Sequence, residues 1–393
     1  MNELRLLQFE SEAGPRSSSV EVLFGGDLCP IGRYEKKILN GERVFDAPLE
    51  NLFRQSDVTM VNLEAPLCEA GLPTESPGGF GLRADPRMAA FVRDCGIDVA
   101  GLSNNHIRDF RDAGVFQTMR NLEQHGVRHV GAGMNLGAAQ EPLALDVNGL
   151  RLGIWALAER ELNVASETSA GSSWFRPEED VHRIKALRAE CDFLVVFLHA
   201  GHEFTTAPSP RLRAAYRSLV AAGADAVIGH HPHVVQGAER YQDGLIAYSL
   251  GNLVFDSPYV DRFQNTDQGY LVRLSISRHC IHAASVISYR LRKNTIVTLL
   301  DHPEFAEFSK TFHELSGIIT DDRRFREEWE RNVRFRWETE YRQVLNNFSK
   351  TFNDVNNKDY AWRTKNLFTC PTHVEMLEKA FLMLEEGTLT RQP

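Results

Sequence analysis

Residues 229–234 read GHHPHV and place three histidines, His230, His231 and His233, within four positions. Neutral imidazole nitrogens are the commonest metal ligands in proteins, and a His-x-His pair at the end of a strand can direct both rings to one point. The proline between His231 and His233 stiffens the turn that joins them. The segment is therefore a candidate metal site, with a surface cluster of titrating histidines as the alternative.

Polar side chains also follow several short apolar runs that are typical of strands. In chain order these are VEVLFGG before Asp27, VTMVNL before Glu64, DVAGLS before Asn104, Asn105 and His106, FLVVFL before His199, ADAVIG before His230, and LIAYSL before Asn252. Runs in which apolar and polar residues do not alternate are typical of strands that helices cover on both faces. Ligands bind at the carboxyl ends of such strands. We therefore expect one cleft, about 6 Å in radius, that gathers the donor atoms of Asp27, Glu64, Asn105, His199, His231 and His233.

Helical periodicity separates these predicted strands. The expected helices are 85–95, 114–125, 178–191 and 210–222, and the last has apolar spacing near 3.6 and stops before Gly223. Strands that alternate with helices predict a layered α/β domain. We assign residues 1–19 to a leader, 20–290 to this domain and 291–393 to a helical C-terminal extension.

A family resemblance rests on six motifs in a fixed order. They are GGD (25–27), NLEAPL (62–67), SNNH (103–106), HAGHEF (199–204), GHHPHVVQGAE (229–239) and YSLGN (248–252). Together with GAGMNLGAAQEPL (131–143), they resemble the CapA-type capsule-synthesis proteins over about residues 20–280. That family is associated with poly-γ-glutamate polymers and is placed in the calcineurin-like metallophosphoesterase superfamily. The resemblance implies a fold of central β-sheets flanked by helices.

The resemblance also implies a two-metal site. The superfamily uses a carboxylate after a Gly, a bridging acid, an Asn beside a catalytic His, a further His and a closing His-x-His. The similar positions here are Asp27, Glu64, Asn105, His199, His231 and His233. This mixed nitrogen and oxygen set suits one or two divalent ions of Mn, Fe, Zn or Ni, and ligand type alone does not select among them.

Two residues next to the predicted ligands are candidates for catalysis. By the same resemblance, His106 is the candidate general acid that protonates a leaving group. Asp109 lies three residues later and would fix the tautomer of His106 if this stretch is helical; an ordinary solvated acid is the alternative. Glu203 and Asn252 are candidates for positioning the ligand imidazoles or a substrate, against a structural role in their loops.

Three positions of the predicted metal site each allow two interpretations. Cys29 stands where the superfamily usually has a His, and is either a soft ligand or a buried apolar residue. Glu64 replaces the usual bridging Asp and moves the carboxylate outward by one methylene, which would suit a mononuclear or asymmetric site. His230 competes with His231 for the ligand role.

Composition excludes several kinds of partner. The 393 residues carry a formal net charge of −9 without a basic run, which disfavours a nucleic-acid groove or an anionic membrane surface. Six cysteines without CxxC spacing suit reduced thiols. No apolar segment approaches the roughly 18 residues of a membrane span, and the first residues lack the apolar core of a signal peptide. CapA-type proteins are often membrane-anchored, whereas these features predict a cytoplasmic protein.

The extension has its own periodicity. Large apolar residues recur every three or four positions among charged neighbours from Phe325 to Phe352, which predicts an amphipathic helix that buries Trp329, Val333 and Trp337 on one face. A second helix is expected over 372–386. The stripe indicates packing on the catalytic domain, with a lid or a contact between copies of the chain as alternatives.

These observations predict a metal-dependent hydrolase or transferase. The resemblance implies a phosphorylated substrate or an acidic, amide-linked polymer or peptide, such as a capsule-related poly-γ-glutamate. A non-catalytic accessory module of a polymer-synthesising complex is the second class of function. The complete ligand set and the presence of His106 favour the enzyme, because a scaffold has no need for a leaving-group acid.

Overall fold

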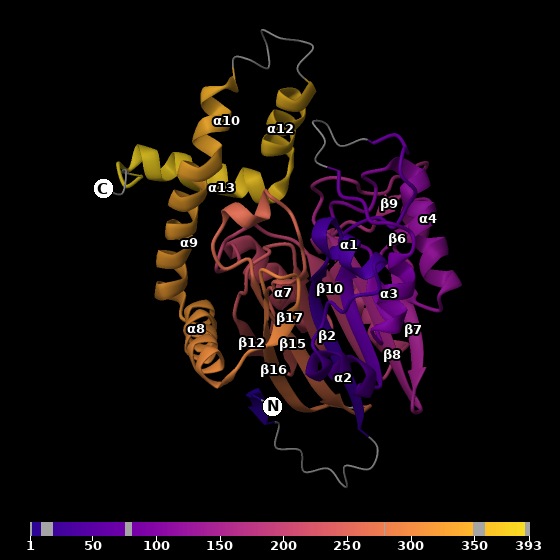
Figure 1. The fold of residues 1–393 in the computed structure, drawn as a ribbon. Coiled ribbons are helices and arrows are strands. Elements are labelled where there is room, and N and C mark those ends of the chain that lie inside the picture. The colour runs from indigo at the N-terminus through magenta and orange to yellow at the C-terminus, as the bar shows by residue number, and fades with distance from the viewer. Residues whose placement is uncertain (1, 9–18, 75–80, 279, 349–357, 390–393) are drawn as a thin grey trace.

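Two β-sheets packed face to face form the centre of the molecule, and helices cover their outer faces (Figure 1). The computed structural model describes residues 2–8, 19–74, 81–278, 280–348 and 358–389. Three apolar cores separate the layers: one between the two sheets and one between each sheet and its helices. The predicted layered α/β fold is confirmed.

The larger sheet carries about the first third of the chain and a later hairpin. Its path is β1 (Leu4–Gln8), β16 (Ile281–Leu291), β15 (Gln268–Ile276), β2 (Val20–Leu28), β3 (Val58–Leu63), β4 (Val99–Gly101) and β5 (Arg128–Val130), with β14 (Asn252–Val254) beside β2 and β17 (Val297–Leu299) beside β16. The pairs β2–β3, β3–β4 and β4–β5 are parallel. Their carboxyl ends therefore meet at one edge of the sheet.

The second sheet has the same parallel arrangement at its centre. Its order is β12 (Ala238–Tyr241), β13 (Gly244–Ala247), β11 (Ala226–His230), β10 (Phe193–His199), β8 (Leu150–Ala158) and β7 (Leu143–Val147). Strands β8, β10, β11 and β13 are parallel to one another, whereas the edge strands β7 and β12 are antiparallel to their neighbours. A small antiparallel pair, β6 (Ala132–Gly133) and β9 (Gly171–Ser172), lies outside both sheets.

The helices pack as separate layers. The larger sheet is covered by α1 (Gly32–Leu39), α2 (Ala47–Gln55), α3 (Met88–Asp94) and α4 (Arg111–Gln124), and the smaller sheet by α6 (Pro177–Ala189) and α7 (Pro210–Ala222). Two short elements, α5 (Leu136–Ala139) and the 3₁₀ turn η3 (Val260–Arg262), lie in connections. All four helices expected between strands are therefore present, with ends shifted by up to three residues.

Local sequence explains where several helices begin. Asp46 and Ser209 accept backbone hydrogen bonds from Leu49 and Leu212, which caps α2 and α7, and each helix has a proline in its first turn. Such side chains satisfy backbone N–H groups that have no partner within the helix. Between the sheets, Phe24 and Phe197 meet edge to face with ring centroids 6.0 Å apart. Strands β2, β3, β10 and β11 are buried along nearly their whole length, as their continuous apolar runs predict.

The domain limits drawn from the sequence differ from the sheet at both ends. Residues Leu4–Gln8, placed in a leader, form β1 and pair antiparallel with β16. Residues 297–299, placed in the extension, form β17, which also pairs antiparallel with β16. Both segments are short and partly exposed, so apolar periodicity gives little signal for them.

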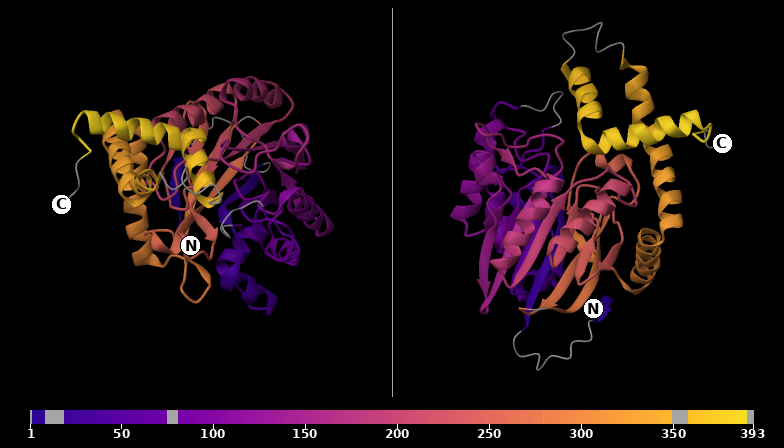
Figure 2. Two further views of the ribbon diagram at one scale, coloured as in Figure 1. Left: turned by 90° about the horizontal axis from the view of Figure 1, so that it is seen from above. Right: turned by 180° about the vertical axis from the view of Figure 1, so that it is seen from behind.

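The C-terminal extension is helical and runs along one side of the sheets (Figures 1 and 2). It consists of α8 (His302–Thr320), α9 (Asp322–Arg336), a π-helical turn η4 (Trp337–Tyr341), α10 (Arg342–Asn346), α12 (Lys358–Thr369) and α13 (Pro371–Glu385). The amphipathic helix is confirmed as a continuous helical run over 322–346, and α13 confirms the second expected helix. Phe352 lies outside the described residues.

Burial of the predicted stripe is confirmed in part. Trp329 and Val333 are buried and form a core with residues of α12 and α13, but Trp337 is only half-buried. Trp337 begins the π-helical turn, whose wider winding turns the following residues away from the α-helical stripe. Packing against the sheet domain, the preferred interpretation, is borne out by contacts such as the hydrogen bond from Thr206 to Glu328.

Several large apolar side chains of the extension are exposed: Phe335, Phe368, Val374, Phe381, Leu382 and Leu384. The contact between copies of the chain that the sequence suggested stays a prediction, and this is the surface on which it would form. No helix in the described residues is both long and apolar enough to cross a membrane. All six cysteines are free thiols.

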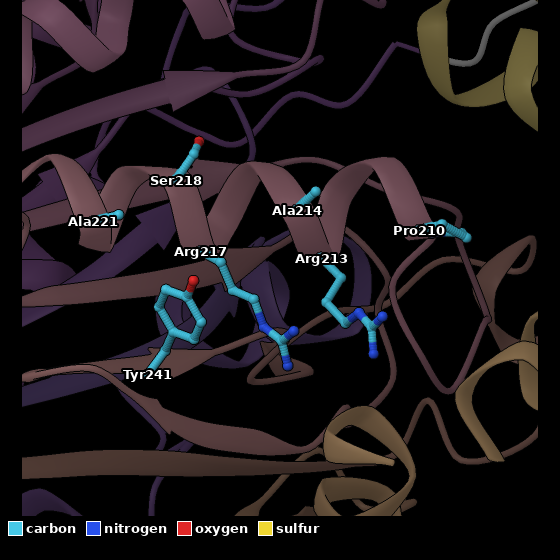
Figure 3. Close-up of a pocket in the computed structure, with 7 residues that line it drawn as sticks. All are labelled: Pro210, Arg213, Ala214, Arg217, Ser218, Ala221 and Tyr241. Carbon is cyan, nitrogen blue, oxygen red and sulfur yellow. The ribbon is translucent and has the colours of Figure 1, made fainter. Parts of the chain in front are cut away.

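A surface groove of about 430 Å³ runs along the outer face of α7 (Figure 3). Two arginines line it, and both are already paired: Arg213 with Asp322 and Arg217 with Glu239. None of the candidate site residues lines this groove.

Candidate metal centre

The candidate ligands lie where the parallel strands of both sheets end. Asp27 is near the end of β2, Glu64 follows β3 directly, His199 ends β10, and His231 follows β11. The residue before Asp27 must be a glycine, because the backbone of Gly251 lies close to it. A Cβ at Gly26 would collide with the carbonyl oxygen of Gly251. The larger and smaller sheets therefore bring these candidate ligands to the same place.

One group of possible ligands is formed by Glu64, His199 and His231. Nε2 of His199 lies 3.1 Å from Nδ1 of His231 and 3.5 Å from Oε1 of Glu64. The amide oxygen of Asn105 is 3.0 Å from the same Nε2 atom. Four potential donor atoms thus surround one point, in keeping with the mixed nitrogen and oxygen sets of divalent metal sites.

A second group is formed by Asp27, Glu64 and His233. Nε2 of His233 lies 3.7 Å from Oε1 of Glu64, and Nδ1 lies 3.7 Å from Oδ2 of Asp27. Nδ1 of His233 is also 2.9 Å from the amide oxygen of Asn252. A hydrogen bond donated by Nδ1 to Asn252 leaves Nε2 as the free ligand atom, which is how the partner of one imidazole nitrogen selects the other for a metal.

Glu64 belongs to both groups, and its environment fits a cation. Both carboxylate oxygens are buried and have no hydrogen-bond partner among the described residues. Burial, together with the nearby charge of Asp27, raises the pKa of Glu64 well above its usual value. A buried carboxylate without donors is costly unless a positive charge compensates it, so the residues present fit one or two divalent ions.

The surroundings of His199 and His233 favour the neutral form that a metal ligand requires. Burial, reinforced by the neighbouring imidazoles, lowers the pKa of His199 well below its usual value. Burial also lowers the pKa of His233. Neutral imidazole is the ligand form, so these rings are prepared for coordination at neutral pH.

His230 and Cys29 are placed differently from the six predicted ligands. Nδ1 of His230 is 3.1 Å from Oδ1 of Asp27, and its ring lies against Phe197 with centroids 5.2 Å apart. Cys29 is fully buried in the apolar core under the larger sheet, and burial raises the pKa of its thiol well above the usual value. Neither joins the two ligand groups of the described residues, and the geometry favours His231 over His230.

His106 and Asp109 form a pair at the rim of the centre. Nδ1 of His106 is 2.8 Å from Oδ2 of Asp109, and the two residues share a turn closed by the Asp109 N–H and the His106 carbonyl. Burial lowers the pKa of His106, but the charge of Asp109 outweighs this effect and the net shift is upward. Asn163 donates to Oδ1 of Asp109 at 2.7 Å and to the Asn105 carbonyl at 2.5 Å. The expected pairing is thus formed in a turn.

Other polar residues support the ligands. Asn62, in β3, donates to Oδ1 of Asp27 at 2.8 Å and lies 3.2 Å from Nδ1 of His199. Glu203 accepts a hydrogen bond from Tyr259 at 3.1 Å, and it raises the pKa of Glu64 through its charge. Asn62 was not predicted, although it lies within the NLEAPL motif, two residues before Glu64.

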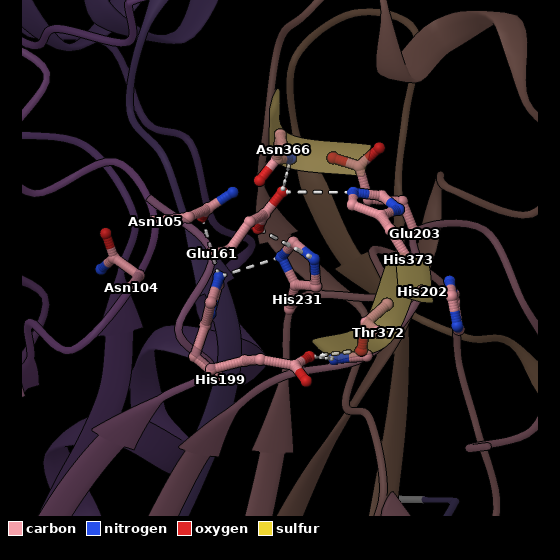
Figure 4. Close-up of polar contacts among 12 residues, drawn as sticks. Asn104, Asn105, Glu161, His199, His202, Glu203, His231, Asn366, Thr372 and His373 are labelled. Carbon is pink, nitrogen blue, oxygen red and sulfur yellow. Dashed lines mark hydrogen bonds and ion pairs between the residues drawn. The ribbon is translucent and has the colours of Figure 1, made fainter. Parts of the chain in front are cut away.

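A third carboxylate, Glu161, approaches the centre from the loop after β8 (Figure 4). Its Oε2 is 3.8 Å from Nε2 of His231, and its Oε1 is 3.8 Å from Nε2 of His373 and 3.1 Å from the amide nitrogen of Asn366. Burial acts against the charged form, but His373 and His231 outweigh it and lower the pKa of Glu161 to about 2. The apolar run LRLGIWALA before this loop is a signal of the kind that identified the other ligands.

The segment that carries His231 and His233 has an unusual backbone. Both residues have positive φ, 96° for His231 and 59° for His233. Non-glycine residues in this region cost about 1–3 kcal/mol each and persist only where the surroundings hold them. The surroundings include a hydrogen bond from the His231 N–H to Oδ2 of Asp27 at 3.2 Å.

The chain matches a known protein family. The family described as bacterial capsule synthesis protein PGA_cap matches residues 21–257, more than half of the chain and the part that contains all six predicted ligands.

Individual relatives are moderately similar. The capsule biosynthesis protein CapA of Bacillus anthracis is 30% identical over 241 residues, which are 59% of this chain and 58% of that protein. A Mycobacterium tuberculosis protein named probable polyglutamine synthesis accessory protein is 29% identical over 226 residues, 53% of this chain and 58% of that protein. A solved structure assigned as a 5′-nucleotidase of Staphylococcus aureus has a TM-score of 0.45 and 15% identity, covering 75% of this chain and 58% of that one. The matched part of the chain thus spans less than two thirds of these relatives.

Proposed function

The chain belongs to the bacterial capsule synthesis protein PGA_cap family, and from this premise we propose that it is a metal-dependent hydrolase or transferase. One divalent ion would be held by Asp27, Glu64 and His233, and a second by Glu64, Asn105, His199 and His231. Divalent ions held in such a site polarise a phosphoryl or carbonyl oxygen of the substrate and lower the pKa of a coordinated water. Mn, Fe, Zn and Ni all suit these ligands.

The observation that carries this proposal is Glu64. Its two oxygens are buried and lack hydrogen bonds among the described residues, and Oε1 faces a histidine of each ligand group. An accessory protein without metal would gain stability by replacing such a carboxylate with an apolar or amide side chain. A bound cation would compensate the charge of this buried carboxylate, which the neighbouring neutral imidazoles cannot do.

His106 would supply the proton for the leaving group. Asp109 accepts a hydrogen bond from Nδ1, so Nε2 is the nitrogen left for a substrate, and the His106 side chain keeps about 20% of its surface exposed. The raised pKa of His106 favours the protonated form that a general acid needs. Asp109 and Asn163 would hold the ring in this orientation.

The proposed substrate is a phosphoester or an acidic, amide-linked polymer or peptide. The printed names of the family and of the Bacillus anthracis relative refer to capsule synthesis, and the Mycobacterium tuberculosis relative is named for polyglutamine synthesis. A γ-glutamyl amide and a phosphoester both present an oxygen that can bind a metal and a leaving group that needs a proton.

The test compares two histidines with different roles. Protein purified without chelator is analysed for metal and assayed on phosphomonoesters, phosphodiesters and γ-glutamyl amides. His106→Ala should keep nearly all metal and lower kcat by about 10²–10⁴-fold, whereas His231→Ala should lose metal and activity together. Loss of metal in His106→Ala, or full turnover in both variants, would show that the roles are wrong.

A second candidate is an accessory module that assists a polymer-synthesising complex without turnover. The name of the Mycobacterium tuberculosis relative supports it. Metal binding by the wild type without turnover on any of the three substrate classes would favour this candidate over the enzyme.

A further inference from the structure

We propose that the C-terminal extension is part of the metal centre, because Asn366 and His373 hold Glu161 against the ligand His231. This inference rests on the proposed metal binding and adds positioning residues to it. Both Asn366 and His373 lie outside the residues matched by the family. The extension would thereby set the metal affinity of a site whose ligands all lie elsewhere.

Glu161 connects the two parts of the molecule (Figure 4). One carboxylate oxygen faces His231 at 3.8 Å, and the other faces His373 at 3.8 Å and Asn366 at 3.1 Å. Its side chain is largely buried, with 15% of its surface exposed, so these contacts are poorly screened by solvent. Without the extension, Glu161 would lose both groups that fix one of its oxygens.

The two nitrogens of His231 point in opposite directions. Nδ1 faces His199 and the ligand group, whereas Nε2 faces Glu161. A carboxylate at the non-coordinating nitrogen orients an imidazole ligand and makes it more basic, and loss of such a partner typically lowers metal affinity about 10–100-fold. His231 also has a positive φ, so its ring projects from a strained backbone and needs a partner that fixes its orientation.

The groups behind Glu161 are themselves fixed. Tyr341 and Nδ1 of His373 are 2.7 Å apart, and the ring of Tyr341 is fully buried. Thr372, next to His373, hydrogen bonds to Glu159 in the same loop as Glu161. Arg211 at the start of α7 pairs with both Glu159 and Glu375. Contacts on both sides of His373 therefore hold it in place beside Glu161.

A purely structural role makes a different prediction. If Glu161 only fastens the extension to the sheets, its loss should resemble the loss of any other fastening contact. Glu375 offers that comparison, since it joins α13 to Arg211 without touching Glu161. Glu378, exposed on the same helix, serves as a neutral surface control.

The experiment titrates Mn²⁺ into the chelator-stripped full chain by calorimetry. Glu161→Gln and His373→Ala should each weaken Mn²⁺ binding about 10–100-fold, whereas Glu375→Gln and Glu378→Gln should leave the Kd within about twofold of the wild type. The double variant Glu161→Gln with His373→Ala should be no weaker than Glu161→Gln alone, because both changes interrupt one chain of contacts. Circular dichroism and thermal unfolding verify that each variant is folded.

The outcomes separate this inference from the proposed function. Wild-type affinity in folded Glu161→Gln and His373→Ala, or an equal loss in Glu375→Gln, would overturn the role of Glu161 and leave metal binding intact. Absence of Mn²⁺ binding by the wild type would overturn the inference together with the proposed two-metal site. Asn366→Ala, which keeps every charge in place, gives a third variant if Glu161→Gln does not fold.

Discussion

The sheet domain and the C-terminal extension contribute to the same centre in different ways. In the sheet domain, parallel strands end together, so residues as distant as Asp27 and His231 are brought within contact by backbone geometry alone. The extension has no such common edge. It reaches the centre through individual side chains, His373 and Asn366, presented by two helices. On the proposed assignment, the sheets gather the ligands, and the extension orients one of them through Glu161.

The difference predicts two kinds of sensitivity. Ligands held by the sheets should be lost singly, without loss of the fold, because the strands that carry them are buried by three separate cores. Residues of the extension act only while its own small core around Trp329 and Val333 stays packed. Changes to that core should therefore reach the metal indirectly.

The largest effect is expected for Glu64→Gln. The variant should bind no metal at either position and have no activity, because Glu64 is common to both ligand groups. Wild-type protein at 1,000 times the metal Kd should gain about 4 kcal/mol of stability from the ion, and the variant none. Chemical unfolding with and without Mn²⁺ measures this. In the absence of metal the variant should be at least as stable as the wild type, since the buried charge is gone; metal-dependent stabilisation of Glu64→Gln would contradict the shared role.

The next largest effect is expected for Trp329→Ala in the extension. Removal of this buried ring should destabilise the protein by about 3 kcal/mol. Because Trp329 packs in the core that supports His373, Mn²⁺ affinity should fall as well. Urea unfolding followed by circular dichroism gives the first quantity, and calorimetric titration gives the second. A clear loss of stability with unchanged Mn²⁺ affinity would break the proposed link between the two parts. Phe381→Ala, at an exposed position of α13, is the control.

The smallest effect is expected for Asp180, a residue of the sheet domain. Burial raises the pKa of Asp180, in α6, to about 6, compared with about 3.9 in an unfolded chain. The folded state therefore binds this proton more tightly, so its contribution to stability is present below about pH 4 and is lost as the pH rises through 6.

Asp180→Asn should remove this dependence. Relative to the wild type, the stability of the variant should increase by about 2 kcal/mol between pH 4 and pH 7. Unfolding free energies at the two pH values test it, and Mn²⁺ affinity at pH 7 should not change, because Asp180 lies in α6, which covers the outer face of the smaller sheet. A stability difference that is independent of pH would show that the carboxyl of Asp180 titrates normally.

The sequence was sufficient for much of the fold and for the main features of the site, for a physical reason. A buried parallel strand needs a continuous apolar run, and the first polar residue after it must lie at the common edge, so Asp27, Glu64 and His199 could be placed together from local pattern. Their roles as ligands stay predictions. The contact between His106 and Asp109 could also be predicted, because the two residues are three positions apart in one turn.

The remaining features depend on contacts that local pattern does not encode. Glu161 follows a clear strand run, but its partner Asn366 is 205 residues away on a helix that packs by its own apolar face. The half-exposure of Trp337 results from a π-helical turn, which α-helical periodicity cannot anticipate. The choice between His230 and His231 required the backbone of residues 231–233, where positive φ values turn the rings.

The long separation between Glu161 and Asn366 bears on how the protein is made. Synthesis proceeds from the N-terminus, so both sheets, with all six candidate ligands, leave the ribosome before α12 and α13. A nascent chain can therefore gather Asp27, Glu64 and the histidines while Glu161 still lacks its fixed partners. The order of translation thus places the proposed anchoring of His231 after the strands of both sheets have been synthesised.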